Sequence, residues 1–160
     1  MRDRGRVRKE SIGPRAFAFA VGAPEREINL LVGHSFNQPL ASRQGGTLTL
    51  VDTDDALSFT AQLPPIDEQP SYMRDAVLNV QGGRMRGLSP GFTVPPRDVV
   101  PDAEVEIPEP GNPGVAIRLI QAAVLYELSL VTRPAYEDAE VEARALAAGL
   151  TLPGRRRLWL

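Results

Sequence analysis

The chain has 160 residues, 42% of them hydrophobic and 24% charged, and a formal net charge of −2. This length suits one domain with a substantial core, and the near-neutral charge gives no general attraction to nucleic acid or to an anionic membrane. Because the chain has no cysteine and only one histidine, His34, we expect no disulfide, no metal site, no cofactor and a reducing, cytosolic setting. No apolar run approaches the roughly 20 residues that cross a bilayer.

The N-terminal part of the chain predicts a loose arm and then a strand. Residues 1–15 are charged and without periodicity, and residues 1–10, which are rich in arginine, are expected to form a basic arm outside the domain. They lack the apolar stretch of a secretory signal. Residues 28–32 form an apolar run that ends at Gly33 and His34, which predicts a buried strand.

A hairpin and a helix are expected next. Polar and apolar residues alternate over residues 47–51 and 57–63, and the acidic cluster at 52–55 supplies a turn between them. This pattern predicts an antiparallel hairpin. Residues 71–80 have the helical spacing of apolar side chains, and two glycines follow to end the helix.

The second half of the chain predicts further strands and a closing helix. Residues 84–94 suggest a strand interrupted by glycine and proline. Residues 95–114 hold six prolines without periodicity, which predicts a long loop, either substrate-gating or a mere insertion. Residues 115–132 suit one bent strand or two strands in sequence, and the Ala- and Glu-rich residues 136–150 predict a helix.

Together these elements favour an α+β fold: a small antiparallel β-barrel core or sandwich with flanking helices and no alternation of strands with helices. The domain is expected over residues 11–150, with the proline-rich loop at 95–114 inside it. A basic tail is expected at residues 151–160.

One short motif points to chemistry. Gly-Leu-Ser-Pro-Gly at residues 87–91 matches the nucleophile elbow of the α/β-hydrolases, in which a helix follows the serine and the histidine comes last in the chain. Here two prolines soon after Ser89 prevent a helix, and His34 precedes the serine. The elbow is therefore excluded. Ser89 is then either a turn residue between glycines or a nucleophile, and His34 either a structural histidine at a strand end or its base.

A third polar position bears on this choice. In an extended strand, Glu127 and Ser129 share one face, while Leu128 and Leu130 share the other. A carboxylate in so apolar a strand is costly to bury as an ion unless it is paired or hydrogen-bonded. A protonated imidazole is a natural partner for it.

Four segments of the chain form a pattern in this order. They are Ser-Ile-Gly-Pro-Arg-Ala-Phe at 11–17, Leu-Val-Gly-His-Ser at 31–35 with Pro39 and Leu40, Gly-Leu-Ser-Pro-Gly-Phe at 87–92, and Glu-Leu-Ser-Leu-Val-Thr-Arg-Pro-Ala at 127–135. In order and spacing they resemble the prohead protease family of tailed bacteriophages, which is distantly related in fold to the herpesvirus capsid-maturation protease. The resemblance runs from about residue 10 to residue 143. It implies a serine endopeptidase with a compact β-barrel core and peripheral helices.

The resemblance also implies roles for individual residues. The nucleophile falls on Ser89, the histidine on His34, and the acidic third member on Glu127, which would fix the imidazole tautomer. In family members, the residue after the nucleophile can donate its backbone N–H to the oxyanion. Here that residue is a proline, which has no N–H. The herpesvirus relatives suggest the backbone N–H groups of Thr132 and Arg133 instead.

The partners implied by the resemblance are capsid components. Such an enzyme is packaged inside the immature capsid, in the host cytoplasm, where it cuts the scaffolding segment of the major capsid protein or a separate scaffold protein, and then itself. Self-association is a further expectation, whereas neither a membrane nor a specific nucleic acid is expected. The alternative is a non-catalytic capsid or tail assembly protein, or an inactive prophage remnant, with the same barrel.

Overall fold

A computed structural model describes residues 9–134, 139–141, 144–146 and 149–157. This part of the chain is mixed α+β, with mostly strands and two helices, α1 (Ala18–Gly22) and α2 (Ser71–Gln81). The strands are β1 (Lys9–Ile12), β2 (Asn29–Val32), β3 (Ser35–Ser42), β4 (Leu48–Asp52), β5 (Ala56–Leu63), β6 (Gly87–Thr93), β7 (Glu104–Glu109), β8 (Asn112–Ile120), β9 (Val124–Val131), β10 (Ala139–Val141), β11 (Arg144–Leu146) and β12 (Gly149–Arg157).

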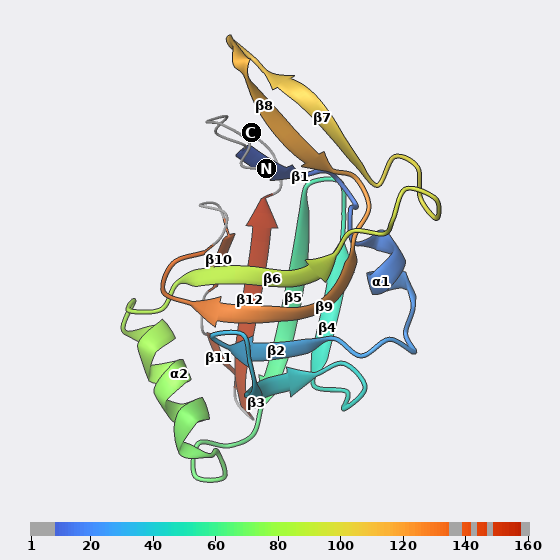
Figure 1. Ribbon diagram of the computed structural model, residues 1–160. Helices are drawn as coiled ribbons and strands as arrows, with labels where there is room; N and C mark the ends of the chain where they lie inside the picture. The colour runs from blue at the N-terminus through green and yellow to red at the C-terminus, as the bar shows by residue number, and fades with distance from the viewer. Residues whose placement is uncertain (1–8, 135–138, 142–143, 147–148, 158–160) are drawn as a thin grey trace.

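The strands form two sheets. The larger has the order β3-β2-β9-β6-β10-β12-β5-β4, with β11 paired to β12, and the smaller has the order β1-β8-β7. In Figure 1, β2, β9 and β6 lie side by side at the front, while β12, β5 and β4 run across behind them. The larger sheet therefore folds over into two layers. The β7–β8 hairpin extends beyond them at the top of the view.

The larger sheet does not close into a barrel. Within the described residues, no pairing joins β3 to β4, the two ends of its strand order. The expected α+β fold of mostly strands is thus confirmed, although only one of its two helices, α2, is at an expected position. The closed antiparallel barrel is not found, and β2 with β9 and β1 with β8 pair in parallel.

The core lies between the two layers and consists of alternate residues of the facing strands. Phe17, just before α1, contacts Phe92 of β6 edge to face, with ring centroids 5.6 Å apart. Each large apolar side chain buried in this way stabilises the fold by about 1.5–3 kcal/mol. The front strands contribute Leu30, Leu88, Leu128 and Leu130, and β5 contributes Leu57, Phe59, Ala61 and Leu63. Because side chains alternate along a strand, the residues between these front-layer leucines lie on the outer face.

Both helices have identifiable ends. The predicted helix over residues 71–80 is confirmed as α2, which ends at Gly82. The short α1 was not expected from the sequence. The guanidinium of Arg43, which follows β3, donates hydrogen bonds to the carbonyl oxygens of Ala20 and Ala23 at 2.7 and 3.2 Å, so it satisfies the C-terminal end of α1.

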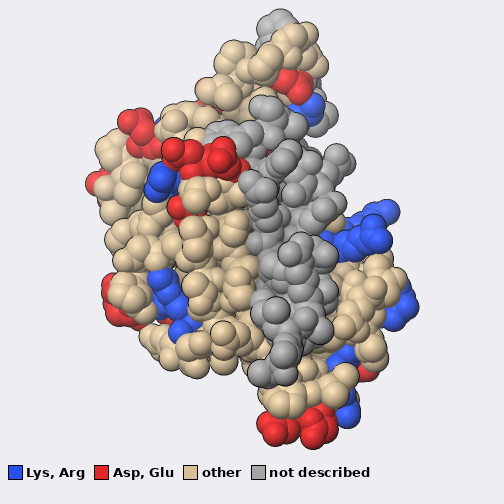
Figure 2. All heavy atoms as spheres, turned by 180° about the vertical axis from the view of Figure 1, so that it is seen from behind, with Lys and Arg blue, Asp and Glu red and all other residues tan. Residues whose placement is uncertain are grey.

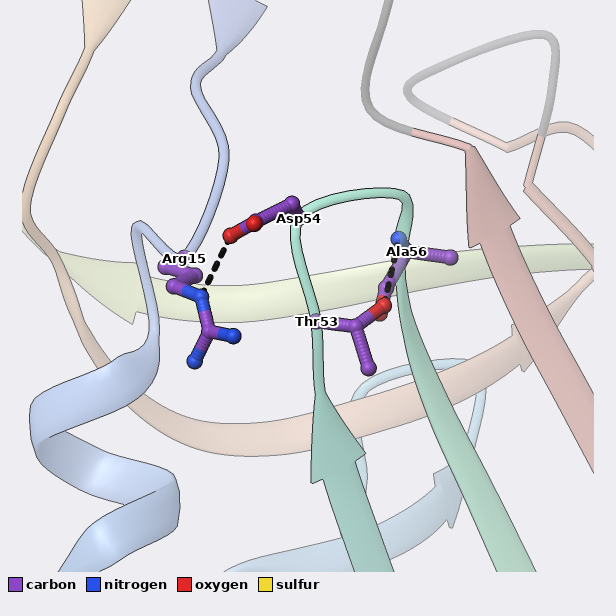
Figure 3. A network of polar contacts seen from close by, with 4 residues as sticks. All are labelled: Arg15, Thr53, Asp54 and Ala56. Atoms are coloured by element: carbon purple, nitrogen blue, oxygen red, sulfur yellow. Dashed lines mark hydrogen bonds and ion pairs between the residues drawn. The ribbon is translucent and has the colours of Figure 1, made fainter.

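The predicted hairpin over residues 47–63 is confirmed as the antiparallel pair β4 and β5. Its turn is held by Thr53, whose N–H and side-chain hydroxyl both donate to the carbonyl of Ala56 at 3.0 Å. Figure 3 shows this turn together with the ion pair between Arg15 and Asp54. This pair ties the segment that leads into α1 to the tip of the hairpin.

Other sequence-based expectations require correction. The loop expected at 95–114 contains β7 and the start of β8, and residues 9–12 of the expected loose arm form β1. The helix predicted over 136–150 is wrong, since its described residues lie in β10, β11 and the start of β12. β12 pairs with β5 from one end to the other, and this pairing outweighs the local helical preference of Ala and Glu. Residues 151–157, expected in a tail, belong to the same strand.

The described surface carries charges of both signs. Seen from behind, most of the described surface is uncharged, with separate groups of acidic and basic side chains scattered over it (Figure 2). In the part of the chain that the structure describes, no helix is long and apolar enough to cross a membrane.

Candidate active site

The turn between β2 and β3 presents His34. Gly33 and His34 form its two residues, with positive φ angles of 56° and 62°, as in a type I′ hairpin turn. The left-handed conformation costs a non-glycine residue roughly 1–2 kcal/mol, so contacts must hold His34 in place. The N–H of Gly33 donates to the carbonyl of Leu130 at 2.9 Å, and the N–H of His34 donates to Ser129 Oγ at 3.0 Å. Both bonds anchor the turn on β9.

The imidazole of His34 contacts the carboxylate of Glu127. The distance between His34 Nδ1 and Glu127 Oε1 is 2.7 Å. The His34 side chain is 49% exposed, whereas that of Glu127 is only 3% exposed. The other carboxylate oxygen, Oε2, accepts a hydrogen bond from Ser129 Oγ at 2.6 Å. The buried carboxylate is therefore hydrogen-bonded on both oxygens, as a buried charge requires.

Ser89 lies on the strand next to this pair. It is directly opposite Ser129 in the antiparallel pairing of β6 with β9, so the two side chains emerge on the same face. Cα atoms in such opposite pairs are about 4.5–5.5 Å apart. Ser89 is buried, at 6% exposure. Among the described residues, Ser89 Oγ makes no hydrogen bond, and the structure brings it beside the His34–Glu127 pair without joining it to the imidazole.

Gly91 makes room for the carboxylate. It lies opposite Glu127 in the same strand pair, and a Cβ atom placed on it would be 2.1 Å from Glu127 Oε1. The oxygen that binds His34 therefore occupies the space above Gly91. The imidazole bound to that oxygen therefore lies close to Gly91. Gly91 is two residues from Ser89 on the same strand, β6.

The other glycine of the 87–91 motif also permits a close approach. A Cβ atom on Gly87 would be 2.7 Å from Cδ of Pro134 and 2.9 Å from the carbonyl oxygen of Val131. Both glycines of the motif therefore admit neighbours across the strand pair, and β6 continues through Pro90 without the interruption expected there.

Thr132 and Arg133 directly follow β9, and both are exposed. Gly33, in the turn that carries His34, is hydrogen-bonded to Leu130, which precedes Thr132 by two residues in the chain. Pro90, which follows Ser89, is buried opposite Leu128. Thr132 and Arg133 thus lie at an exposed end of β9, the strand on which the turn that carries His34 is anchored.

Two site residues were missed as such from the sequence. Ser129 was noted only for sharing a face with Glu127, and Gly91 only as part of a motif. The alternation of polar residues along β9 is the signal that could have identified Ser129. For Gly91 the sequence gives no signal, because its neighbour is across a strand pair whose register becomes visible only in the structure. Among the described residues, no group of three or more His, Asp or Glu side chains could hold a metal ion.

Comparison with protein families identifies the chain. A family model described as caudovirus prohead serine protease matches residues 3–151, which is most of the sequence. The chain belongs to this family. No curated protein and no solved structure matches it. Membership makes this prohead protease a hydrolase of the serine protease class, with a role in bacteriophage capsid maturation inside the assembling procapsid.

Proposed function

We propose that this prohead protease cuts peptide bonds with Ser89 as nucleophile, His34 as general base and Glu127 as the residue that orients the imidazole. The observation that carries this proposal is the 2.7 Å contact between His34 Nδ1 and the buried Glu127 carboxylate. With Nδ1 engaged, Nε2 is the ring nitrogen available to a hydroxyl. Ser89 supplies the nearby hydroxyl from the neighbouring strand, on the same face of the sheet.

The reaction follows from these three groups. Ser89 Oγ attacks the scissile carbonyl carbon while its proton passes to His34 Nε2. The imidazolium then gives this proton to the leaving amine, the C–N bond breaks, and an ester to Ser89 remains. A water molecule that loses a proton to Nε2 attacks the ester carbonyl, the bond to Ser89 Oγ breaks, and the imidazolium returns the proton to Oγ as the new carboxyl end is released. Glu127 stabilises the imidazolium in both steps, and general-base action of this kind is worth roughly 10²–10⁴-fold in rate.

The oxyanion donors in this proposal are the backbone N–H groups of Thr132 and Arg133. Pro90 has no N–H, so the residue after the nucleophile cannot donate. The exposure of both residues supports the assignment, because they directly follow the strand on which the turn that carries His34 is anchored. One such donor is worth about 10²–10³-fold in rate.

We infer the substrates from the family. They are the scaffolding segment of the major capsid protein, or a separate scaffold protein, and the protease itself, which implies self-association. A protease domain that includes β1 and β12, and a fold related to the herpesvirus protease, belong to the same proposal. The family match supports a role in capsid maturation in general.

A serine-reactive fluorophosphonate tests the proposed chemistry without a known cleavage site. The wild-type chain should be labelled at Ser89, as located by peptide mass spectrometry, and His34→Ala should reduce the labelling rate to background. Ser58→Ala, which removes a hydroxyl from β5, serves as the matched control and should label like the wild type.

Co-expression with the major capsid protein of the same phage tests the proposed substrate. Mass spectrometry should show a shortened capsid protein with the wild-type protease and an intact one with Ser89→Ala. If a folded wild-type sample neither reacts with the fluorophosphonate nor shortens the capsid protein, the non-catalytic assembly role replaces the protease. Labelling without capsid cleavage would retain the catalytic residues and reject the substrate.

A further inference from the structure

Ser129 occupies a central place in the polar network. Its side chain is fully buried, at 0% exposure, on the outer face of β9. Its Oγ accepts the backbone N–H of His34 at 3.0 Å and lies 2.6 Å from Glu127 Oε2. Because the carboxylate can only accept, Ser129 donates its hydroxyl proton to Glu127.

These contacts close a ring of hydrogen bonds. The backbone N–H of His34 binds Ser129, Ser129 binds one oxygen of Glu127, and the other oxygen binds His34 Nδ1 at 2.7 Å. The ring holds both the backbone and the side chain of His34. The backbone needs such support, since His34 has the positive φ angle of 62° that disfavours a side chain.

The same contacts argue against Ser129 as a nucleophile. Its hydroxyl proton is engaged by Glu127, and its oxygen already accepts a bond from His34. A nucleophile must transfer its proton to the base at the moment of attack. Ser89, directly opposite on β6, makes no such contact within the described residues.

We propose that Ser129 is a positioning residue for the catalytic pair, an inference that rests on the proposed function. By binding Glu127 Oε2 it turns Oε1 toward the imidazole, and by binding the His34 N–H it fixes the turn that presents the ring. The result is a neutral imidazole with its proton on Nδ1 and with Nε2 ready to accept the proton of Ser89. Ser129 itself touches neither the substrate nor the reacting atoms.

The single histidine allows a direct spectroscopic test. Since His34 is the only imidazole in the chain, one set of ring resonances reports its tautomer in ¹⁵N-labelled protein. The wild type should show a protected, far-downfield Nδ1 proton and the Nδ1–H tautomer. Ser129→Ala should lose the protected proton and shift toward a mixture of tautomers, while Ser129→Thr, which keeps a hydroxyl, should restore the signal. A Ser129→Ala protein with the wild-type ring spectrum would contradict the proposal.

Fluorophosphonate labelling supplies the second measurement, on the same full-length variants. Misplacement of a catalytic group by about 1 Å can cost 10²-fold, so Ser129→Ala should label roughly 10- to 100-fold more slowly than wild type. Ser129→Thr should recover at least part of the rate, and Ser58→Ala should not differ from wild type.

The two proposals fail in different ways. If His34→Ala labels as fast as wild type, the proposed function itself is wrong. If His34→Ala is inert and Ser129→Ala, folded by circular dichroism, labels within twofold of wild type, only the positioning role is wrong. If neither Ser129 variant folds, Glu127→Gln replaces them, since it keeps the shape of the side chain and weakens the ring of hydrogen bonds. The proposal then requires that Glu127→Gln lose the protected Nδ1 proton; if it keeps that proton, the proposal is wrong.

Discussion

At the scale of single residues, the site depends on an absent side chain. Glu127 can extend toward His34 only because Gly91, opposite it on β6, leaves space above its Cα. This explains the second glycine of the 87–91 motif without a nucleophile elbow. The sequence predicted roles for Ser89 and Glu127 because polar side chains stand out in apolar strands, but it could not assign Gly91, whose contact lies across the sheet.

We expect Gly91→Ala to damage the site more than the fold. The added methyl would overlap Glu127 Oε1, so the carboxylate must move and its hydrogen bond to His34 must break or lengthen. Fluorophosphonate labelling should fall by about 10²-fold, in line with a displacement of about 1 Å.

The matched control for this substitution is Gly22→Ala. An added Cβ there meets nothing within 4 Å, so its labelling rate should equal that of the wild type. Equal rates for both alanine variants would show that Glu127 has another way to reach the histidine.

At the scale of elements, the β2–β3 turn holds the catalytic candidate in an unfavourable conformation. Both turn residues have positive φ, which glycine adopts easily and histidine does not. The sequence predicted β2 and its end at Gly33 and His34, but not the parallel pairing of β2 with β9 that anchors the turn. That pairing joins segments far apart in the chain, so no local pattern reports it.

This strain makes a paired comparison informative. His34→Ala and His34→Gly both remove the imidazole and leave Glu127 without its partner, but only glycine relieves the backbone. His34→Gly should therefore be more stable to urea than His34→Ala by about 1 kcal/mol, with both inactive in labelling. Equal stabilities would indicate that the turn relaxes to a different conformation when the ring is lost.

Elements whose own sequence pattern matches their structure were predicted correctly, and elements formed by pairing with distant strands were not. The β4–β5 hairpin follows from alternation on either side of an acidic turn, and α2 from apolar spacing ended by Gly82. The segment at 136–150 has a helical composition, yet its described residues are strands, because β12 fits between β10 and β5. The local sequence of residues 136–150 cannot show that β5, far away in the chain, needs a neighbouring strand on that side.

At the scale of the whole molecule, one buried carboxylate links stability to pH. Asp52, at the end of β4, has both carboxylate oxygens buried without a hydrogen bond of good geometry among the described residues. Burial raises its pKa from 3.8 to about 6, and the nearby charge of Arg15 and the backbone of Phe17 offset this only in part. The folded state therefore holds the Asp52 proton more tightly than the unfolded chain does.

This raised pKa has a definite sign for stability. The contribution of Asp52 is fully favourable below about pH 4 and is lost as the pH rises through about 6. Wild type loses this contribution as the pH rises, and Asp52→Asn does not. The free energy of unfolding of Asp52→Asn minus that of wild type, both measured in urea, should therefore increase between about pH 4 and about pH 8. We expect a change of about 1 kcal/mol, because Asp52 as a residue is only partly buried, although its carboxylate oxygens are, and nearby solvent screens the charge.

The exposed Asp55 on the same turn provides the control for this measurement. Because Asp55 is in contact with water in the folded protein, Asp55→Asn should show no comparable trend across the same pH range. A parallel trend in both variants would assign the effect to the net charge of the hairpin and not to burial of Asp52.

The place of β12 in the sheet has a consequence for biosynthesis. This strand follows all the others in chain order, yet it lies in the interior of the larger sheet and connects β10 to β5. Until residues 149–157 have emerged from the ribosome, the larger sheet lacks the strand that pairs with both β10 and β5, so β6 has no continuous strand pairing to β5 and β4. A nascent protease should therefore stay incompetent to cut its neighbours during translation, and ribosome-bound chains stalled before residue 149 should not react with a fluorophosphonate.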